Sequence, residues 1–142
     1  MGISLKTKQL VLLATVSFTM TACSNVPPPA VETLAGNWKV MSIQDKQILA
    51  NSSVKLNFSP DNSLSGSASC NNLSSSYQTN NNSLIIAPIA TTRKMCLPAL
   101  MEQESNLLRT LGKVKRYQLN KGELSLYNQQ GLIQLKAKRV KQ

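Results

Sequence analysis

The amino-acid sequence predicts a mainly β protein, a small antiparallel meander that closes into a barrel and carries one inserted α-helix at about residues 97–111. Short runs in which apolar and polar residues alternate follow one another from residue 34 to residue 140. The gaps between these runs contain Asn, Asp, Gly or Pro, which is typical of hairpin turns. Only one segment has apolar residues at helical spacing. Strands at such regular spacing favour a barrel or a sandwich.

The first 22 residues are predicted to be a signal peptide. Lys6 and Lys8 precede an apolar run at residues 10–20, and small residues follow it. This run of eleven residues is far shorter than the roughly 20 residues that a membrane-spanning helix needs. A short buried helix is the alternative interpretation.

The end of this segment resembles a bacterial lipobox. It reads "MTAC", with an apolar residue, two small residues and Cys23. The resemblance implies that Cys23 becomes the lipid-carrying N-terminus, and residues 23–33, rich in Ser, Asn and Pro, are predicted to form a flexible tether. Several acyl chains together hold a protein firmly on a bilayer. Ser24 follows the cysteine, and under the enteric sorting rule that the lipobox implies it directs the protein to the outer membrane.

The predicted strands follow the tether within a single domain at residues 34–142. Each has the period-two pattern and ends at turn residues. In the last strand the alternation places Gln134 and Lys136 on a polar outer face and Leu135 and Ala137 on an apolar inner face. In chain order, the predicted strands are 34–43, 54–58, 63–70, 76–80, 83–90, 114–120, 124–128 and 132–140.

The segment "LPALMEQESNLLRTLG" interrupts the strands with a predicted amphipathic helix. Pro98 suits the first turn of a helix, and Gly112 suits its C-terminal cap. A single apolar stripe is typical of core packing, so the helix is expected to cover one opening or one face of the sheet. Binding of a partner is the alternative. The stripe consists of Leu97, Leu100, Met101, Leu107, Leu108 and Leu111.

The charge balance is strongly basic. Sixteen Lys and Arg residues oppose six Asp and Glu residues, which gives +10, and loss of Lys6 and Lys8 with the signal peptide leaves about +8 on 120 residues. Such a length supports one domain with a single core. The predicted envelope location, and the lack of a basic strand interleaved with aromatic residues, argue against nucleic acid as a partner. The basic segment 136–142 is interpreted as the solvated end of a strand, with contact to anionic lipid headgroups as the alternative.

Candidate catalytic residues are few. The chain contains no histidine, which removes the commonest general base and zinc ligand. The close acidic pair, Glu102 and Glu104, sits two positions apart and would point to different faces of a helix. No enzymatic activity, metal or cofactor is therefore predicted. The acidic residues are Glu32, Asp45, Asp61, Glu102, Glu104 and Glu123.

The cysteines that remain beside Cys23 are Cys70 and Cys96. In an oxidising compartment such a pair is expected to form a disulfide. Two cysteines without histidine make a poor metal site. A reactive thiol at Cys96, activated by the neighbouring Arg93 and Lys94, stays open as an alternative.

The sequence resembles the META domain of the HslJ type, a family of bacterial envelope proteins. A glycine-containing strand that ends in Cys-Asn, "LSGSASCNNLSSSY" at 64–77, matches one family signature, and "ATTRKMCLPALMEQE" at 90–104 matches the other. The opening "LAGNWKV" at 34–40 resembles the first strand of the family. The resemblance extends from residue 34 to about residue 138.

The resemblance implies a lipocalin-like barrel with one inserted helix and a general link to heat shock and envelope stress, without an agreed reaction. It also implies that Thr91, Thr92, Arg93 and Met95 lock the helix start by capping and packing. Cys96 would then pin that start to the strand that ends at Cys70. For Thr92 and Arg93 the structural role is the first interpretation, and contact of Arg93 with an anion beside the helix start is the alternative.

These observations favour a non-enzymatic, monomeric outer-membrane lipoprotein that faces the periplasm and supports envelope integrity or tolerance of heat and stress. Its predicted membrane partner is reached through Cys23, and its protein partner is not identified. One alternative is a binding module that inhibits a host enzyme or a protease, although basic lysozyme would be repelled by a basic domain. Another is a lipocalin-like carrier of a small ligand, which requires an apolar internal cavity.

Overall fold

The computed structural model describes residues 32–141. The predicted signal peptide, the lipidation site at Cys23 and most of the predicted tether lie outside the described residues. The elements are β1 Gly36–Ile43, β2 Lys46–Gln47, β3 Val54–Phe58, β4 Ser63–Ala68, β5 Asn72–Asn80, β6 Ser83–Ile86, β7 Ala90–Thr91, α1 Pro98–Leu111, β8 Arg116–Asn120, β9 Glu123–Tyr127 and β10 Ile133–Arg139.

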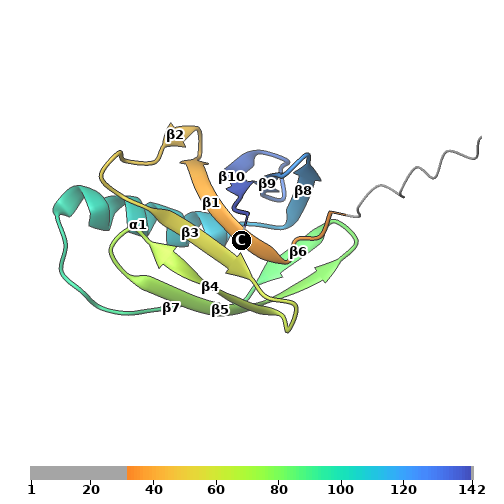
Figure 1. Cartoon of the computed structure of the whole chain (residues 1–142), viewed down its shortest axis with the longest axis horizontal. Helices are drawn as coiled ribbons and strands as arrows, with labels where there is room; N and C mark the ends of the chain where they lie inside the picture. The colour runs from red at the N-terminus through yellow and green to blue at the C-terminus, as the bar shows by residue number, and fades with distance from the viewer. Residues whose placement is uncertain (1–31, 142) are drawn as a thin grey trace, which may run out of the picture.

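Eight strands form a closed antiparallel ring (Figure 1). Their order around the ring is β1, β3, β4, β5, β6, β8, β9 and β10, and β10 pairs again with β1. The short strands β2 and β7 pair with β1 and β5 outside this ring. The thinnest joint lies between β6 and β8, where Ser83 pairs with Arg116. The predicted fold class, a mainly β antiparallel barrel with one helix, is confirmed.

The interior of the barrel is packed with side chains. Alternate residues of each strand point inward, so the apolar member of each alternating pair is removed from water. Trp38 and Phe58 are fully buried and are the largest side chains of this core. The core also contains Leu107 and Leu111 of α1. These side chains occupy the space between the strands, where a lipocalin-like carrier would hold its ligand.

The barrel has two ends that differ in what they carry (Figure 1). We call one the N-terminal end; it holds Glu32 and the turns that follow β3, β5 and β8. We call the other the helix end; it holds the turns that follow β1, β4 and β9 and the start of α1. In the view of Figure 1, the N-terminal end lies to the right and the helix end to the left.

The strands differ from their predictions in several places. β5 begins at Asn72, whereas the predicted strand began at residue 76. The predicted strand 83–90 is divided into β6 and β7, because Pro88 cannot donate a ladder hydrogen bond. β4 ends at Ala68, two residues before Cys70, and Ser69 has a φ of +98° in the turn that follows. Gln134 was expected on the outer face, but it is buried, because the pairing of β10 with β9 shifts register between Ile133 and Leu135.

The helix begins at Pro98 and ends at Leu111, close to its predicted bounds, and Gly112 follows as its C-terminal cap. Leu107 and Leu111 are completely buried and pack into the helix end of the barrel. The first turn behaves differently from the prediction, because Leu97 and Met101 are exposed. The apolar stripe therefore covers the barrel opening with its C-terminal half only.

Candidate functional site

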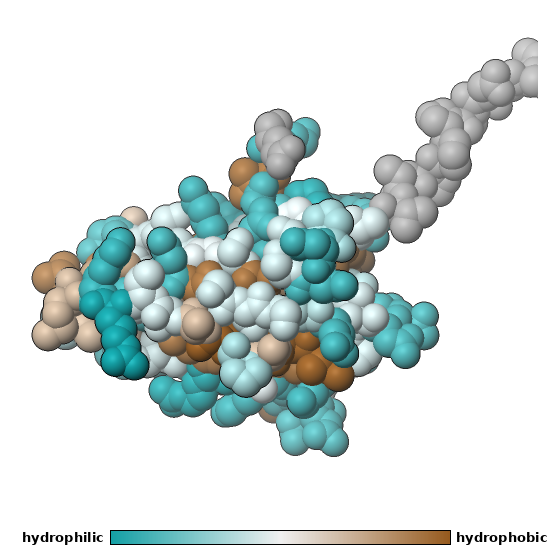
Figure 2. Space-filling model, turned by 90° about the horizontal axis from the view of Figure 1, so that it is seen from below, coloured by the Kyte–Doolittle hydropathy of each residue, from teal (hydrophilic) through white to brown (hydrophobic). Residues whose placement is uncertain are grey.

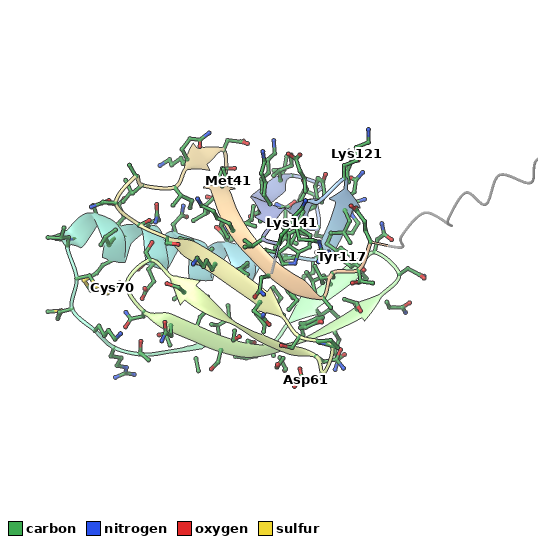
Figure 3. The ribbon with its side chains drawn as sticks, viewed as in Figure 1. Met41, Asp61, Cys70, Tyr117, Lys121 and Lys141 are labelled. Atoms are coloured by element: carbon green, nitrogen blue, oxygen red, sulfur yellow. A yellow bond between two sulfur atoms is a disulfide. The ribbon has the colours of Figure 1, made fainter. Side chains whose placement is uncertain are left out.

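The predicted pair Cys70 and Cys96 is joined by a disulfide at the helix end, with Cα atoms 6.0 Å apart. This separation lies within the range of about 4.4–6.8 Å that a disulfide allows. The bond connects the turn after β4 to the residue that precedes the helix N-cap, Leu97. In Figure 3, Cys70 lies at the left, beside the start of α1.

Asn71, the residue next to the disulfide, holds three segments together. Its side chain is buried, and its Oδ1 accepts hydrogen bonds from the Thr92 hydroxyl at 2.8 Å and from the Lys94 backbone N–H at 2.7 Å. Its Nδ2 donates to Oε1 of Glu104 at 2.8 Å. The Cys-Asn pair therefore fixes both the loop before α1 and the helix itself.

Glu104 is a buried carboxylate in the middle of α1, and the sequence analysis did not identify it as a site residue. Its Oε2 accepts hydrogen bonds from the backbone N–H groups of Cys70 at 3.2 Å and Asn71 at 2.7 Å. A signal was present in the sequence, since Glu104 lies three residues before Leu107 and seven before Leu111, at stripe positions of the helix. A carboxylate at a buried position must find donors, and the turn after β4 supplies them.

The residues of "ATTRKMC" take roles that differ in part from those predicted. Thr92 is structural, since its hydroxyl donates to Asn71 and accepts from the backbone N–H of Asn72 at 3.1 Å. It does not cap the helix, because the N-cap is Leu97 and no side chain bonds there. Packing by Met95 was also expected, and this prediction is wrong, because Met95 is 90% exposed. The side chain of Arg93 is exposed, and its contact with an anion stays a prediction.

The helix end also exposes apolar side chains. Leu97 is 63% exposed, and Met101 on the first turn of α1 is partly exposed as well. In the space-filling view from below, brown and tan atoms appear at the left, where the loop before α1 and the first helical turn lie (Figure 2). The disulfide at Cys96 and the hydrogen bond from the Lys94 backbone to Asn71 fix the loop that carries these exposed side chains.

Gly66, in the glycine-containing strand of the first motif, allows β3 and β4 to approach closely. A Cβ atom built at this position would lie 2.0 Å from the carbonyl oxygen of Lys55. Such a contact is impossible without movement of the strand backbone. The glycine of this motif is therefore explained by the geometry of the barrel, with no role in chemistry.

The N-terminal end is held by side chains that bond to backbone. The guanidinium of Arg139 donates to the carbonyl oxygens of Ala35, at 3.0 Å, and Thr33, and it stacks over the ring of Trp38 at 4.3 Å. The indole N–H of Trp38 donates to the carbonyl of Leu34 at 2.8 Å. These bonds fasten the incoming chain to β10.

Within residues 32–141, His, Cys, Asp and Glu side chains form no group of three or more that could hold a metal ion. An open groove of about 640 Å³ lies between α1 and the β1–β2 hairpin, and Lys46, Glu102 and Arg109 are among its lining residues. None of the helices in the described range is both long enough and apolar enough to span a bilayer.

The family comparison agrees with this architecture. Residues 29–140 match the META domain. The chain belongs to the META domain family. Both sequence motifs of this META domain meet at the helix end, where Cys70 and Asn71 of the first contact Thr92, Lys94, Cys96 and Glu104 of the second. No match is found among curated protein sequences.

Solved structures share the fold at low sequence identity. A Burkholderia xenovorans protein studied by NMR has a TM-score of 0.62 at 19% identity, over 75% of this chain and 83% of its own. Another protein studied by NMR has a TM-score of 0.59 at 24% identity, over 73% and 88%. The crystal structure of a DUF4847 family protein from Bacteroides vulgatus has a TM-score of 0.54 at 12% identity, over 76% and 94%. These similarities establish the fold of the META domain and nothing beyond it.

Proposed function

We propose that the protein is a non-enzymatic, monomeric outer-membrane lipoprotein that faces the periplasm and supports envelope integrity under heat or other stress. The anchor is lipid on Cys23. The observation that carries the proposal is the position of the N-terminal end, opposite the helix end where the two family motifs meet. A membrane anchor on that side leaves the motif end free to face the periplasm.

The length of the tether agrees with this arrangement. Glu32 lies nine positions after Cys23, and a fully extended chain spans at most about 3.3–3.6 Å per residue. The N-terminal end would therefore stay within roughly 35 Å of the lipid anchor. The closed barrel and its disulfide give a domain that resists unfolding in an oxidising compartment.

The anchor is tested by metabolic labelling with a clickable fatty acid. The wild-type protein should carry label, and Cys23→Ala should carry none, because no other residue provides the thioether. Ser24→Asp serves as the sorting variant and should move the protein to inner-membrane fractions in a host with the enteric rule. Label retained on Cys23→Ala would contradict the anchor.

The envelope role is tested in the native host with the gene deleted. The deletion strain should lose viability at elevated temperature or in detergent, and the wild-type gene should restore it. Cys23→Ala should restore it poorly if the anchor matters. Equal survival of the deletion strain and its parent under every stress would overturn the proposed role.

The absence of catalysis is tested on the purified chain that begins at Ser24. Ester, peptide, glycoside and disulfide substrates should give background rates, because the chain lacks histidine and the paired acids that such reactions commonly use. Turnover that disappears on a single substitution would contradict this part of the proposal.

A further inference from the structure

Three lysines stand side by side on the outer surface of the barrel. Lys39 on β1 lies directly opposite Lys55 on β3 and directly opposite Lys138 on β10. Directly opposed residues of antiparallel strands point to the same side of the sheet. All three side chains are exposed, and we call this row of three residues the lysine face.

The lysine face works against stability. Like charges directly opposite each other on neighbouring strands repel. The ion pair formed here joins Lys138 to Glu123 at 3.7 Å, and both side chains are more than 60% exposed, so water and salt screen it. Within residues 32–141, Lys39 and Lys55 have no carboxylate within 4 Å. The barrel therefore keeps an unfavourable arrangement that its fold does not need.

The neighbouring strands show that the barrel can be built without such charges. The outer residues of β4 and β5 pair as Ser63 with Ser76 and Ser65 with Ser74, and Ser67 pairs with Asn72. This surface carries hydroxyl and amide groups only. On the β4 side the lysine face therefore borders a neutral surface, whereas on the other side β9 places Glu123 opposite Lys138.

A hollow beside the lysine face brings Lys141 close to Lys55, and in it the amide of Asn57 donates to Oδ1 of Asn37. It measures about 460 Å³, and Lys55, Lys141, Asn37, Asn57 and Ser67 are among its lining residues. In Figure 3, Lys141 lies near the middle of the molecule, close to β1. Ammonium, amide and hydroxyl groups together suit a phosphate group. Asp45 and Glu123 line a second hollow together with Lys136 and Lys138, on the β10 side of the lysine face.

We propose that the lysine face docks on a bilayer surface of anionic phospholipids, whose phosphates accept hydrogen bonds from Lys39, Lys55 and Lys138 and from the neighbouring Lys141. This inference rests on the proposed location at a membrane, and the tether length keeps the domain near that surface. A polybasic surface is attracted to anionic lipid within about one Debye length, roughly 8 Å at physiological salt. A second copy of the chain is a poor occupant, since its lysine face carries the same charge.

The experiment measures vesicle binding by the soluble chain from Ser24 to Gln142, which retains every ring strand and α1 and lacks the lipid. Vesicles contain phosphatidylcholine alone or with about one third phosphatidylglycerol. Binding should require phosphatidylglycerol and should fall as salt rises. Each lysine at the surface contributes about fivefold in partitioning, so replacing Lys39, Lys55 and Lys138 together by Gln should lower it roughly a hundredfold at low salt.

The matched control replaces three exposed lysines on other parts of the surface by Gln. Lys46 lies on β2, Lys94 precedes α1, and Lys113 follows it. This variant has the same net charge as the first one and should retain most of the vesicle binding. Equal loss in both variants, or no binding to phosphatidylglycerol, would overturn the proposal.

Two further measurements distinguish docking on lipid from binding of a small anion and test the docked orientation. Inorganic phosphate at about 10 mM should not displace the protein, since a multivalent contact is stronger than a single one. Full displacement would indicate a small-anion site and refute docking. The lipidated full-length protein in the same vesicles should show slower acetylation of Lys39 and Lys55 than of Lys46 and Lys94. Equal acetylation rates would refute the docked orientation, whereas the lipid label on Cys23 tests the anchor separately.

Discussion

The two ends of this barrel are stabilised by different kinds of bond. At the helix end, the Cys70–Cys96 disulfide and the buried Glu104 carboxylate join the turn after β4 to α1. At the N-terminal end, Arg139 donates to two backbone carbonyls and Tyr77 to one, through hydrogen bonds that are exposed or only partly buried. Removing a group from the first end breaks a covalent link or leaves buried donors without acceptors. At the N-terminal end, water can form hydrogen bonds with the carbonyl groups that lose a donor.

The difference shows where this META domain requires a fixed structure. The helix end carries both family motifs, and its exposed loop residues keep their positions only because the residues behind them are locked. The N-terminal end needs only to join the chain to the barrel. We therefore expect substitutions at the helix end to cost more stability than substitutions at the N-terminal end.

The largest effect is expected from loss of the disulfide. Cys70→Ala, Cys96→Ala and the double variant should each lower the free energy of unfolding by up to about 3.5 kcal/mol, because each opens the same loop between residues 26 positions apart. Urea denaturation with and without reductant measures this, and reductant should not affect the variants. If the urea midpoint of the wild-type protein did not change on reduction, the disulfide would not account for the higher stability expected at the helix end.

Free thiols distinguish a structural role for Cys96 from a reactive one. The native protein should not react with a maleimide until reductant is added, and a non-reduced digest should contain the linked peptides. A reactive Cys96 would give free thiol in the native protein, with Cys96→Ala impairing function and Cys70→Ala leaving it intact.

The second effect comes from Glu104. Glu104→Ala should lower the free energy of unfolding by about 2–3 kcal/mol, because the backbone N–H groups of Cys70 and Asn71 lose their acceptor in a buried site. Glu104→Gln keeps one acceptor oxygen and should cost less. Glu102→Ala is the matched control, since Glu102 is exposed on the same helix and should change stability by less than about 0.5 kcal/mol. Equal losses for the two alanine variants would contradict the role of Glu104.

Much of the fold follows from local patterns in the sequence. Alternation and turn residues identify the ring strands, and leucine spacing with Pro98 identifies α1. The register shift that buries Gln134 could not be predicted, because it depends on how β10 meets β9 in space. The strand at 83–90 was over-extended because its apolar pattern outweighed Pro88.

Of the candidate site, only the Cys70–Cys96 disulfide could be predicted from the sequence. Cysteine spacing and compartment indicate the disulfide, whereas the bonds of Asn71 and Glu104 join residues 33 positions apart and depend on tertiary structure. Side chains of the second motif were expected to cap the helix, but the loop is held instead by Asn71 of the first motif. The lysine face was also hidden, since it depends on the register of β1 with β3 and on the pairing of β10 with β1 that closes the barrel.

A smaller effect is expected at the N-terminal end from Arg139. Arg139→Gln should lower the free energy of unfolding by about 1–2 kcal/mol, because bonds to the incoming chain and the stacking over Trp38 are lost. Arg139→Lys keeps the charge but not the planar fork, so it should recover only part of the loss. Arg139→Gln as costly as loss of the disulfide would remove the proposed difference between the two ends.

The smallest effect concerns Tyr77, and it depends on pH. The hydroxyl of Tyr77 donates to the carbonyl of Ser59 at 2.8 Å. Burial raises the pKa of Tyr77 above its ordinary value of 10.0, and the nearby Asp61 carboxylate adds to the increase. Since the folded protein holds this proton more tightly than the unfolded chain, the stabilisation is complete below pH 10 and is lost as pH rises through the folded pKa. Tyr77→Phe should cost about 1 kcal/mol at pH 7, and the difference from wild type should shrink above pH 10.

Urea denaturation at a series of alkaline pH values measures this dependence. Asp61→Asn sharpens the test, because removing the carboxylate lowers the pKa of Tyr77 and should move the alkaline loss of stability to lower pH. Disulfide-bonded cysteines do not titrate, so the Cys70–Cys96 bond at the helix end contributes no such dependence on alkaline pH. The free energies of unfolding of Tyr77→Phe and wild type could instead differ by the same amount at every pH. Tyr77 would then stabilise the N-terminal end through packing alone, and the contrast between a titratable end and a covalently locked end would fail.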